Sequence, residues 1–186
     1  MAEPLPRIVS RRSSRLSPWV EIVAREVEFT QGGPTQTYHA VGQADYISIV
    51  AVTPELRIPI VRQYRPAVEA FTWELPAGLV EPGEDPAVSC RRELLEETGF
   101  PARTVQALGT GYPCTGRLGN RIHSYYVETG ERARDFVPEA GIATRLVTPA
   151  ELAELIASGE FVSHLHLGAL LLAEVHSLFT LPRPSR

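Results

Sequence analysis

The sequence of 186 residues has the composition of an ordinary globular protein, with 44% hydrophobic and 22% charged residues, and its length suits one domain with a sizeable core. The formal net charge of −4 gives no sign of a broad nucleic-acid-binding surface. Only two cysteines occur, so we expect a reduced, cytoplasmic setting and not a disulfide framework. No apolar run reaches membrane-spanning length and the N-terminus lacks an apolar signal region, so we expect no membrane association.

The N-terminal region differs in composition from the rest of the chain. Residues 1–18 are rich in proline, arginine and serine, which predicts a loosely held arm. A single domain is expected over residues 19–181. At its start, apolar and charged residues alternate over 19–29, and the turn sequence QGGP leads into a second extended segment at 35–41. The two segments predict an N-terminal β-hairpin.

Short apolar runs bounded by turn residues predict further strands along the chain. These strands are expected at 46–52, 57–65, 71–75, 104–110, 121–129 and 142–147. A capping box at residues 148–151 begins a helix that Gly159 ends, and a last helix is expected over about 163–178. One mixed sheet flanked by helices, an α/β fold, is the simplest architecture for this order of elements.

Residues 78–100 read GLVEPGEDPAVSCRRELLEETGF and hold the strongest local signals. Asp85 is a good helix N-cap, Pro86 suits the first helical position, and Gly99 suits the left-handed residue that ends a helix. The helical wheel predicts an apolar face made of Ala87, Val88, Cys90, Leu94 and Leu95.

Three glutamates of this helix are predicted to share the opposite face. Glu93, Glu96 and Glu97 follow one another at spacings that bring side chains together, and like charges at such spacings repel. A cluster of this kind suggests that a cation binds there. Mg²⁺ prefers oxygen ligands and pairs with phosphate substrates, so it is the metal that the pattern favours.

The whole stretch resembles the Nudix box, G-x5-E-x7-R-E-U-x-E-E-x-G-U with U apolar, at every fixed position. The matching residues are Gly78, Glu84, Arg92, Glu93, Glu96, Glu97 and Gly99, with Leu94 and Phe100 in the apolar slots. The segments RQYRPA (62–67), WELPAGLVEPGE (73–84) and RLGNRIH (117–123) are similar to the ADP-ribose and ADP-sugar pyrophosphatase branch of that family.

This resemblance implies the Nudix α/β/α sandwich with a mixed central sheet, and a homodimer in which the N-terminal hairpin takes part. It also implies Mg²⁺-dependent cleavage of ADP-ribose to AMP and ribose 5-phosphate, with Mn²⁺ as a substitute metal. Gly116 stands where the branch often has proline. Three alternatives therefore stay open: another nucleotide sugar, an oxidised nucleoside triphosphate, or a nucleotide-sensing module without turnover.

The resemblance also assigns roles to the metal site. Glu93, Glu97 and the backbone carbonyl of Ala77 are the expected ligands, and Glu96 is a further ligand or bridge. Arg92 is expected to hold a glutamate in position, and Glu84 to support the site.

For the general base, Glu139 is the matching candidate, with Asp135 or a glutamate of the box as the alternative. On the substrate side, Arg65 is expected to grip a phosphate and Glu74 to accept hydrogen bonds from the substrate.

Two aromatic residues, Trp19 and Tyr38, match rings that stack on adenine in similar enzymes, where the two rings come from different subunits. His164 and His166 would face apart on a helix, so we expect neither to bind a metal.

Overall fold

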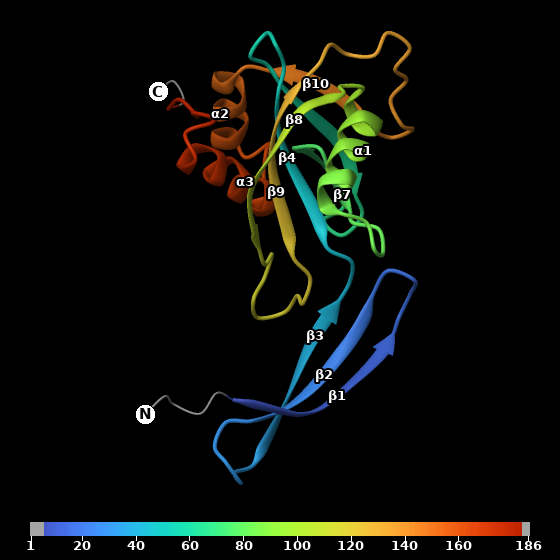
Figure 1. The fold of residues 1–186 in the computed structure, drawn as a ribbon, viewed down its shortest axis with the longest axis vertical. Helices are drawn as coiled ribbons and strands as arrows, with labels where there is room; N and C mark the ends of the chain where they lie inside the picture. Colours follow the sequence, from blue (N-terminus) through green and yellow to red (C-terminus); the bar gives the residue numbers. More distant parts are fainter. Residues whose placement is uncertain (1–5, 184–186) are drawn as a thin grey trace. The chain divides into compact units, whose positions relative to one another are not determined.

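The computed structural model describes residues 6–183, and the chain divides into two compact units (Figure 1). Unit 1 contains the chain up to Ala44 and the segment Tyr112–Arg121, and unit 2 contains Asp45–Gly111 and the chain from Ile122 onward. This division differs from the single domain expected over residues 19–181.

Unit 1 is built on an antiparallel sheet of three strands in the order β1-β2-β3. Its strands are β1 (Arg7–Arg15), β2 (Glu21–Glu28) and β3 (Thr35–Gly42). The predicted hairpin of β2 and β3 is confirmed. The loosely held arm predicted over residues 1–18 is wrong for β1, which pairs with β2 along its length, while residues 1–5 lie outside the described part.

Unit 2 contains two sheets. Their strands are β4 (Tyr46–Val52), β5 (Ile58–Arg65), β6 (Ala70–Glu74), β7 (Ala77–Leu79), β8 (Ala102–Gly111), β9 (Ile122–Thr129) and β10 (Ala143–Val147). The order β7-β4-β9-β8 forms a mixed sheet, because β4 and β9 run parallel and the other neighbours antiparallel. This confirms the predicted mixed central sheet. However, β10, β5 and β6 form a separate antiparallel sheet, and the short strand β7 was not predicted.

Three helices belong to unit 2: α1 (Pro86–Thr98), α2 (Pro149–Ser158) and α3 (His164–Val175). The starts and ends of α1 and α2 agree closely with the predicted capping signals, and α3 is shorter than the helix expected over about 163–178. Asp85 accepts a hydrogen bond from the Ala87 N–H at 2.8 Å, and Gly99 adopts the left-handed φ of 75°. No helix within residues 6–183 is long and apolar enough to cross a membrane.

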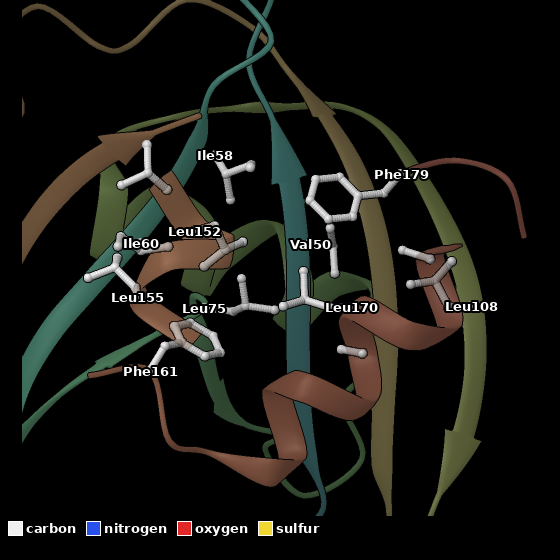
Figure 2. Packing of buried hydrophobic residues seen from close by; sticks show 13 residues of the cluster. Val50, Ile58, Ile60, Leu75, Leu108, Leu152, Leu155, Phe161, Leu170 and Phe179 are labelled. Carbon is white, nitrogen blue, oxygen red and sulfur yellow. The ribbon is translucent and has the colours of Figure 1, made fainter. Parts of the chain in front are cut away.

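Strand β4 lies between two hydrophobic cores, with α1 on one side of its sheet and α2 and α3 on the other (Figure 1). Ile47, Ile49 and Ala51 pack in the core that contains Cys90 and Leu94 of α1. The alternating residue Val50 packs in the other core, among side chains of β5, α2 and α3 (Figure 2). Both faces of β4 are therefore buried, which accounts for its almost continuous apolar sequence, in which Ser48 is the polar exception.

Candidate active site

Two glutamates of α1 face the short strand β7. The Glu97 side chain is buried, and its Oε2 accepts a hydrogen bond from the Ala77 N–H at 3.0 Å. The Glu93 carboxylate lies so close to Gly78 that a Cβ atom built at residue 78 would be 2.1 Å from Glu93 Cδ. The glycine that opens this motif therefore leaves the space that Glu93 occupies.

The buried face of α1 differs from the predicted apolar face. Val88 and Leu95 are exposed, whereas Glu97 is buried together with Cys90 and Leu94. These three buried residues fall at i, i+4 and i+7, which is one helix face. The prediction assigned Glu97 to the polar face with Glu93 and Glu96, whereas the structure buries its carboxylate against β7.

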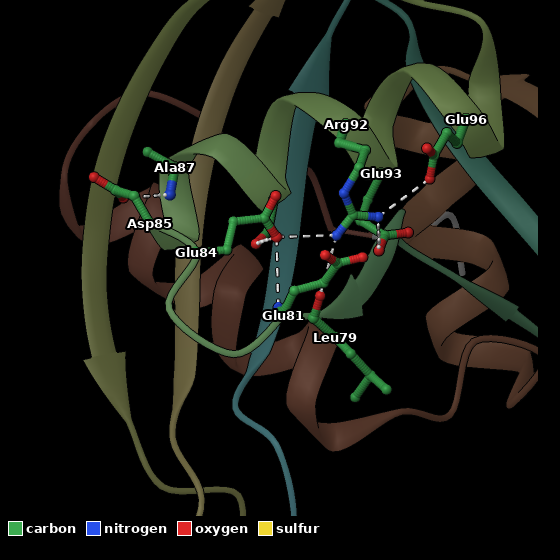
Figure 3. A network of polar contacts seen from close by, with 9 residues as sticks. Leu79, Glu81, Glu84, Asp85, Ala87, Arg92, Glu93 and Glu96 are labelled. Carbon is green, nitrogen blue, oxygen red and sulfur yellow. Dashed lines mark hydrogen bonds and ion pairs between the residues drawn. The ribbon is translucent and has the colours of Figure 1, made fainter. Parts of the chain in front are cut away.

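Arg92 joins the remaining acids of the motif (Figure 3). Its Nη1 donates to Glu93 Oε1 at 2.7 Å and to Glu96 Oε2 at 3.2 Å. Its Nη2 donates to Glu84 Oε2 at 3.2 Å and to the Leu79 carbonyl at 3.4 Å. Arg92 therefore fixes the positions of three carboxylates relative to the loop after β7.

The pKa values of Glu93 and Glu97 shift in the opposite direction to that of Glu84. Burial raises the pKa of Glu97 to about 8, against the opposing effect of the Ala77 N–H. Burial also raises the pKa of Glu93, although Arg92 opposes it. By contrast, hydrogen bonds from Ser89 and Arg92 lower the pKa of Glu84. Glu97 thus needs additional positive charge to stay ionised near neutral pH, and added positive charge would also favour the ionised form of Glu93.

The donor chemistry fits a hard divalent cation. The carboxylates of Glu93 and Glu97 and the backbone carbonyl of Ala77 offer only oxygen, as Mg²⁺ prefers. Within residues 6–183, no three His, Cys, Asp or Glu side chains are gathered into a ready metal cluster. Glu96 instead points to Arg92, so its role as a further ligand or bridge stays a prediction.

A pocket of about 300 Å³ in unit 2 borders Ala77 and is lined by Arg65, Glu74 and His166 among others. The Glu74 carboxylate is buried at its edge and accepts two hydrogen bonds from Arg65. It also accepts bonds from Thr72 Oγ1 at 2.5 Å and from His166 Nε2 at 3.4 Å. In this structure Glu74 therefore holds Arg65, while the role predicted for it as a substrate ligand is untested.

Glu74 and Arg65 each stabilise the charged form of the other. Burial alone would raise the pKa of Glu74, but the hydrogen bonds from Arg65, His166 and Thr72 outweigh it and hold this pKa well below its usual range. The bond to Glu74 in turn raises the pKa of Arg65. Arg65 is a permanent cation at the pocket, as its expected phosphate-binding role requires.

The sequence interpretation missed His166 as part of this network. It is 3% exposed, and its Nδ1 lies 2.9 Å from Ser48 Oγ on β4. A signal was present, because His166 shares a helical stripe with the buried residues Ala169, Leu170 and Ala173 of α3. A histidine in such a stripe must find polar partners, and Ser48 and Glu74 provide them.

Comparison with known proteins gives the family. The family model described as NUDIX domain matches residues 43–165. The chain belongs to the Nudix family. The box geometry described above is the geometry of its Nudix motif.

Several proteins named as hydrolases or pyrophosphatases are similar to this chain. The chain is 34% identical over 133 residues to a CMP-5'-(N-acetyl-N-hydroxy-3-aminopropyl)phosphonate hydrolase of Streptomyces rubellomurinus, covering 71% of this chain and 65% of the relative. It is 33% identical over 159 residues to an ADP-ribose pyrophosphatase of Mycobacterium tuberculosis, covering 82% and 76%. An ADP-ribose pyrophosphatase of Bacillus subtilis is 28% identical over 144 residues, covering 76% and 77%.

A solved structure described as an ADP compounds hydrolase has the same Nudix fold. The two structures superpose with a TM-score of 0.79 at 17% identity, covering 96% of this chain and all of the other. Together with the relatives, this confirms the predicted Nudix fold, the ADP-ribose pyrophosphatase branch and the class of Nudix pyrophosphohydrolase.

The loop that carries Glu139 and Asp135 is attached to the end of the Nudix helix. The Ala133 N–H donates to the Gly99 carbonyl at 2.8 Å, and Arg132 Nε donates to the Thr98 carbonyl at 2.9 Å. Glu139 itself is exposed on this loop. The loop therefore begins beside the turn of α1 that holds Glu97, and Glu139 stays a predicted base.

The two predicted stacking residues of the Nudix enzyme both lie in unit 1. The exposed fractions are 69% for Trp19 and 48% for Tyr38, so both rings are accessible to a ligand. Tyr38 also lines a pocket of about 510 Å³ together with Arg25, Tyr112 and Arg117. This pocket combines aromatic faces with two guanidinium groups.

Proposed function

We propose that this Nudix protein hydrolyses the diphosphate bond of a nucleoside diphosphate sugar, with Mg²⁺ as its metal and ADP-ribose as the favoured substrate. The products would be AMP and ribose 5-phosphate. The observation that carries the proposal is the pair Glu93 and Glu97, which are held against β7 with raised pKa values next to the pocket of Arg65. Two of its relatives are ADP-ribose pyrophosphatases, which supports the choice of substrate.

The chemistry follows from the charge of the substrate. A diphosphate bridge repels hydroxide and water until its negative charge is compensated. Mg²⁺, when bound, supplies this compensation and lowers the pKa of a bound water. Glu93, Glu97 and the Ala77 carbonyl would hold the metal, and Arg92 would keep Glu93 oriented.

Other residues act on the substrate and the water. The N–H groups of Arg65 that Glu74 leaves free can bind a phosphate in the planar geometry that guanidinium favours. Glu139 would accept the proton of the attacking water, with Asp135 or a box glutamate as the alternative base. Arg92 would act by keeping the carboxylates in place, and Glu96 would be a further metal ligand or bridge.

The base of the substrate calls for an aromatic site. Tyr38 and Trp19 are accessible rings in unit 1, and Arg25 and Arg117 beside Tyr38 suit a ligand that joins an aromatic base to phosphates. We also propose a cytoplasmic homodimer in which the β2–β3 hairpin takes part, as in the branch that the chain resembles.

A second candidate substrate class rests on one relative. The hydrolase of S. rubellomurinus is named for a CMP-linked phosphonate, and the chain is 34% identical to it. A cytidylyl compound is therefore the main competitor of ADP-ribose, whereas the intact acids of the box argue against a sensor without turnover.

A substrate panel with product identification tests these proposals. Purified protein is incubated with ADP-ribose, GDP-mannose, a CMP-linked phosphonate and an oxidised nucleoside triphosphate, each with Mg²⁺, with Mn²⁺ and with chelator. We expect AMP and ribose 5-phosphate from ADP-ribose only with metal. Faster release of CMP or of GMP would overturn the choice of ADP-ribose, and binding without any turnover would favour the sensor.

The adenine contact has its own test. Trp19→Ala should raise KM for ADP-ribose about 5- to 150-fold, since base–aromatic stacking contributes roughly 1–3 kcal/mol per base. Because the ring is 69% exposed, folding stability should change little. Ile8→Ala in the same unit, 45% exposed, is the control. An unchanged KM for Trp19→Ala would contradict the stacking assignment.

A further inference from the structure

The hydrogen bonds around Glu74 fill its carboxylate completely. Oε1 accepts from Arg65 Nε at 2.8 Å and from Thr72 Oγ1 at 2.5 Å. Oε2 accepts from Arg65 Nη2 and from His166 Nε2, the latter at 3.4 Å. An ionised carboxylate offers about four acceptor positions, so each oxygen has two donors and the plane of the group is fixed.

The orientation of Arg65 depends on that plane. A guanidinium group has five N–H donors in a rigid fork, and Glu74 takes one from Nε and one from Nη2. The remaining N–H groups are those available to a phosphate in the pocket that Arg65 lines. Any rotation of the Glu74 carboxylate would turn these donors away from their present direction.

His166 is itself held from the other side. Since the ionised carboxylate can only accept, Nε2 of His166 carries a proton, and Nδ1 can then accept from the Ser48 hydroxyl at 2.9 Å. The ring also packs edge-on against Phe161, with ring centroids 6.2 Å apart. With both nitrogens bonded and the ring packed, His166 has one orientation.

The chain of contacts begins at the proposed metal site. Ser48 on β4 pairs with Ala77 on β7, whose carbonyl is an expected metal ligand. From Ser48 the contacts pass through His166 and Glu74 to Arg65. Ala77 at the start of this series and Arg65 at its end line the same pocket. The series thus connects the strand pair that places the metal-binding carbonyl with the cation that meets the phosphate.

We propose that His166 is a positioning residue for substrate binding, which fixes the Glu74 carboxylate and thereby directs the free N–H groups of Arg65 into the pocket. His166 does not touch the substrate and acts only through Glu74. The inference rests on the proposed function for the identity of the substrate, whereas the contacts that carry it are independent of that choice.

Three variants test this role. His166→Leu removes both nitrogens at similar volume, His166→Gln keeps an N–H donor toward Glu74, and Ser48→Ala removes the support of the ring. Kinetics with ADP-ribose and Mg²⁺ should show KM raised about tenfold for His166→Leu, the size expected for one hydrogen bond to a charged group, with kcat changed less than about twofold. His166→Gln should stay within about threefold of wild type, and Ser48→Ala should raise KM about threefold.

Repeating these substitutions in Arg65→Ala protein distinguishes a positioning role from a general loss of stability. In Arg65→Ala protein, neither His166→Leu nor Ser48→Ala should raise KM further, because there is no guanidinium to orient. If either variant raises KM by the same factor in both backgrounds, or if both leave KM unchanged in the wild-type background, the inference is overturned. Should His166→Leu fail to fold, Ser48→Ala decides the question alone.

A binding measurement keeps the two proposals distinguishable. Calorimetry with a methylene-bridged ADP-ribose analogue should show about tenfold weaker binding to His166→Leu than to wild type. Turnover by wild type with unchanged analogue binding to His166→Leu overturns this inference alone. If wild type hydrolyses none of the panel, the proposed function fails, and weaker binding of the analogue to His166→Leu still supports the positioning role.

Discussion

Two glutamates of unit 2 have nearly the same burial but opposite electrostatic states. Glu74 is 5% exposed and Glu97 is 6% exposed. The Glu74 carboxylate is paired with Arg65 and its pKa is held low, whereas Glu97 receives a single backbone N–H and its pKa rises to about 8. The comparison shows that the partner, and not the depth, decides the charge of a buried acid. An acid that has its cation is part of the scaffold, and one that lacks it can bind an exchangeable cation.

The largest expected effect is on turnover. Glu97→Gln removes a ligand charge while keeping the shape, so kcat for ADP-ribose should fall about 100-fold or more, because a metal supplies several kcal/mol of charge stabilisation. Steady-state kinetics with Mg²⁺ measure this. Glu131→Gln, an exposed acid, is the matched control and should keep wild-type kcat. Near-normal kcat in Glu97→Gln would remove Glu97 from the metal site.

The next effect is on folding stability, where Glu74 should matter more than Glu97. Glu74→Gln breaks a buried ion pair and should cost about 2–4 kcal/mol, less than a fully buried pair because the Arg65 side chain is 42% exposed and can turn to water. Glu97→Gln should cost almost nothing at pH 8 without metal. Urea unfolding of both variants measures the difference. A greater loss for Glu97→Gln than for Glu74→Gln would contradict the comparison.

The pH dependence of stability sharpens the contrast. The pKa of Glu97 rises from 4.5 to about 8 on folding, so between these values the folded, metal-free protein binds one more proton than the unfolded chain. Its stability contribution is therefore lost as pH rises through this window, at up to about 1.4 kcal/mol per pH unit. Glu74 has the opposite sign, because its pKa is lowered and its contribution is lost as pH falls below 4.5.

Urea unfolding at pH 5, 6, 7 and 8 in the presence of a chelator tests this sign. The difference in unfolding free energy between wild type and Glu97→Gln should grow in favour of the variant as pH rises. Added Mg²⁺ should reduce that difference by stabilising the wild type. A difference that is constant with pH would show that Glu97 is ionised throughout the window.

The smallest effect concerns the helix that carries the acids. Asp85→Ala removes the N-cap bond to the Ala87 N–H and should cost about 1 kcal/mol of unfolding free energy. The KM for ADP-ribose should not change, since Asp85 contacts neither Glu74 nor Glu97. Asp85→Asn keeps an N-cap acceptor and should restore most of the stability. A change in KM would mean that α1 shifts as a whole.

The predictions that succeeded depended on local signals. Caps and turn residues determine the bounds of α1 and α2, and alternation marks the β2–β3 hairpin, because these features act within a few residues. Strand β1 escaped prediction because its arginines and serines follow no apolar pattern, and only pairing with β2 makes it a strand. The three-residue β7 is too short to give any periodicity.

Among the site residues, local sequence signals identified some, and the contacts of the others depend on the fold. The spacing of the Nudix box identified its acids, since a motif is local. That Glu97 points inward, that Glu74 is saturated and that His166 reaches Ser48 all depend on segments brought together by the fold. Such contacts leave little trace in local spacing. The exceptions are the histidine in the buried stripe of α3 and the helical spacing of Glu97 from Cys90 and Leu94.

The last glycine of the box has a second constraint beyond ending its helix. A Cβ atom at residue 99 would lie 2.4 Å from Phe136 Cγ, so the ring of a distant loop rests in the space that the missing side chain leaves. Replacing Gly99 by alanine would both strain the left-handed backbone and displace the segment that bears Glu139. Gly99 therefore provides the packing site for Phe136 of a distant loop. The Nudix motif thus helps to position this loop as well as to supply the acids expected to bind the metal.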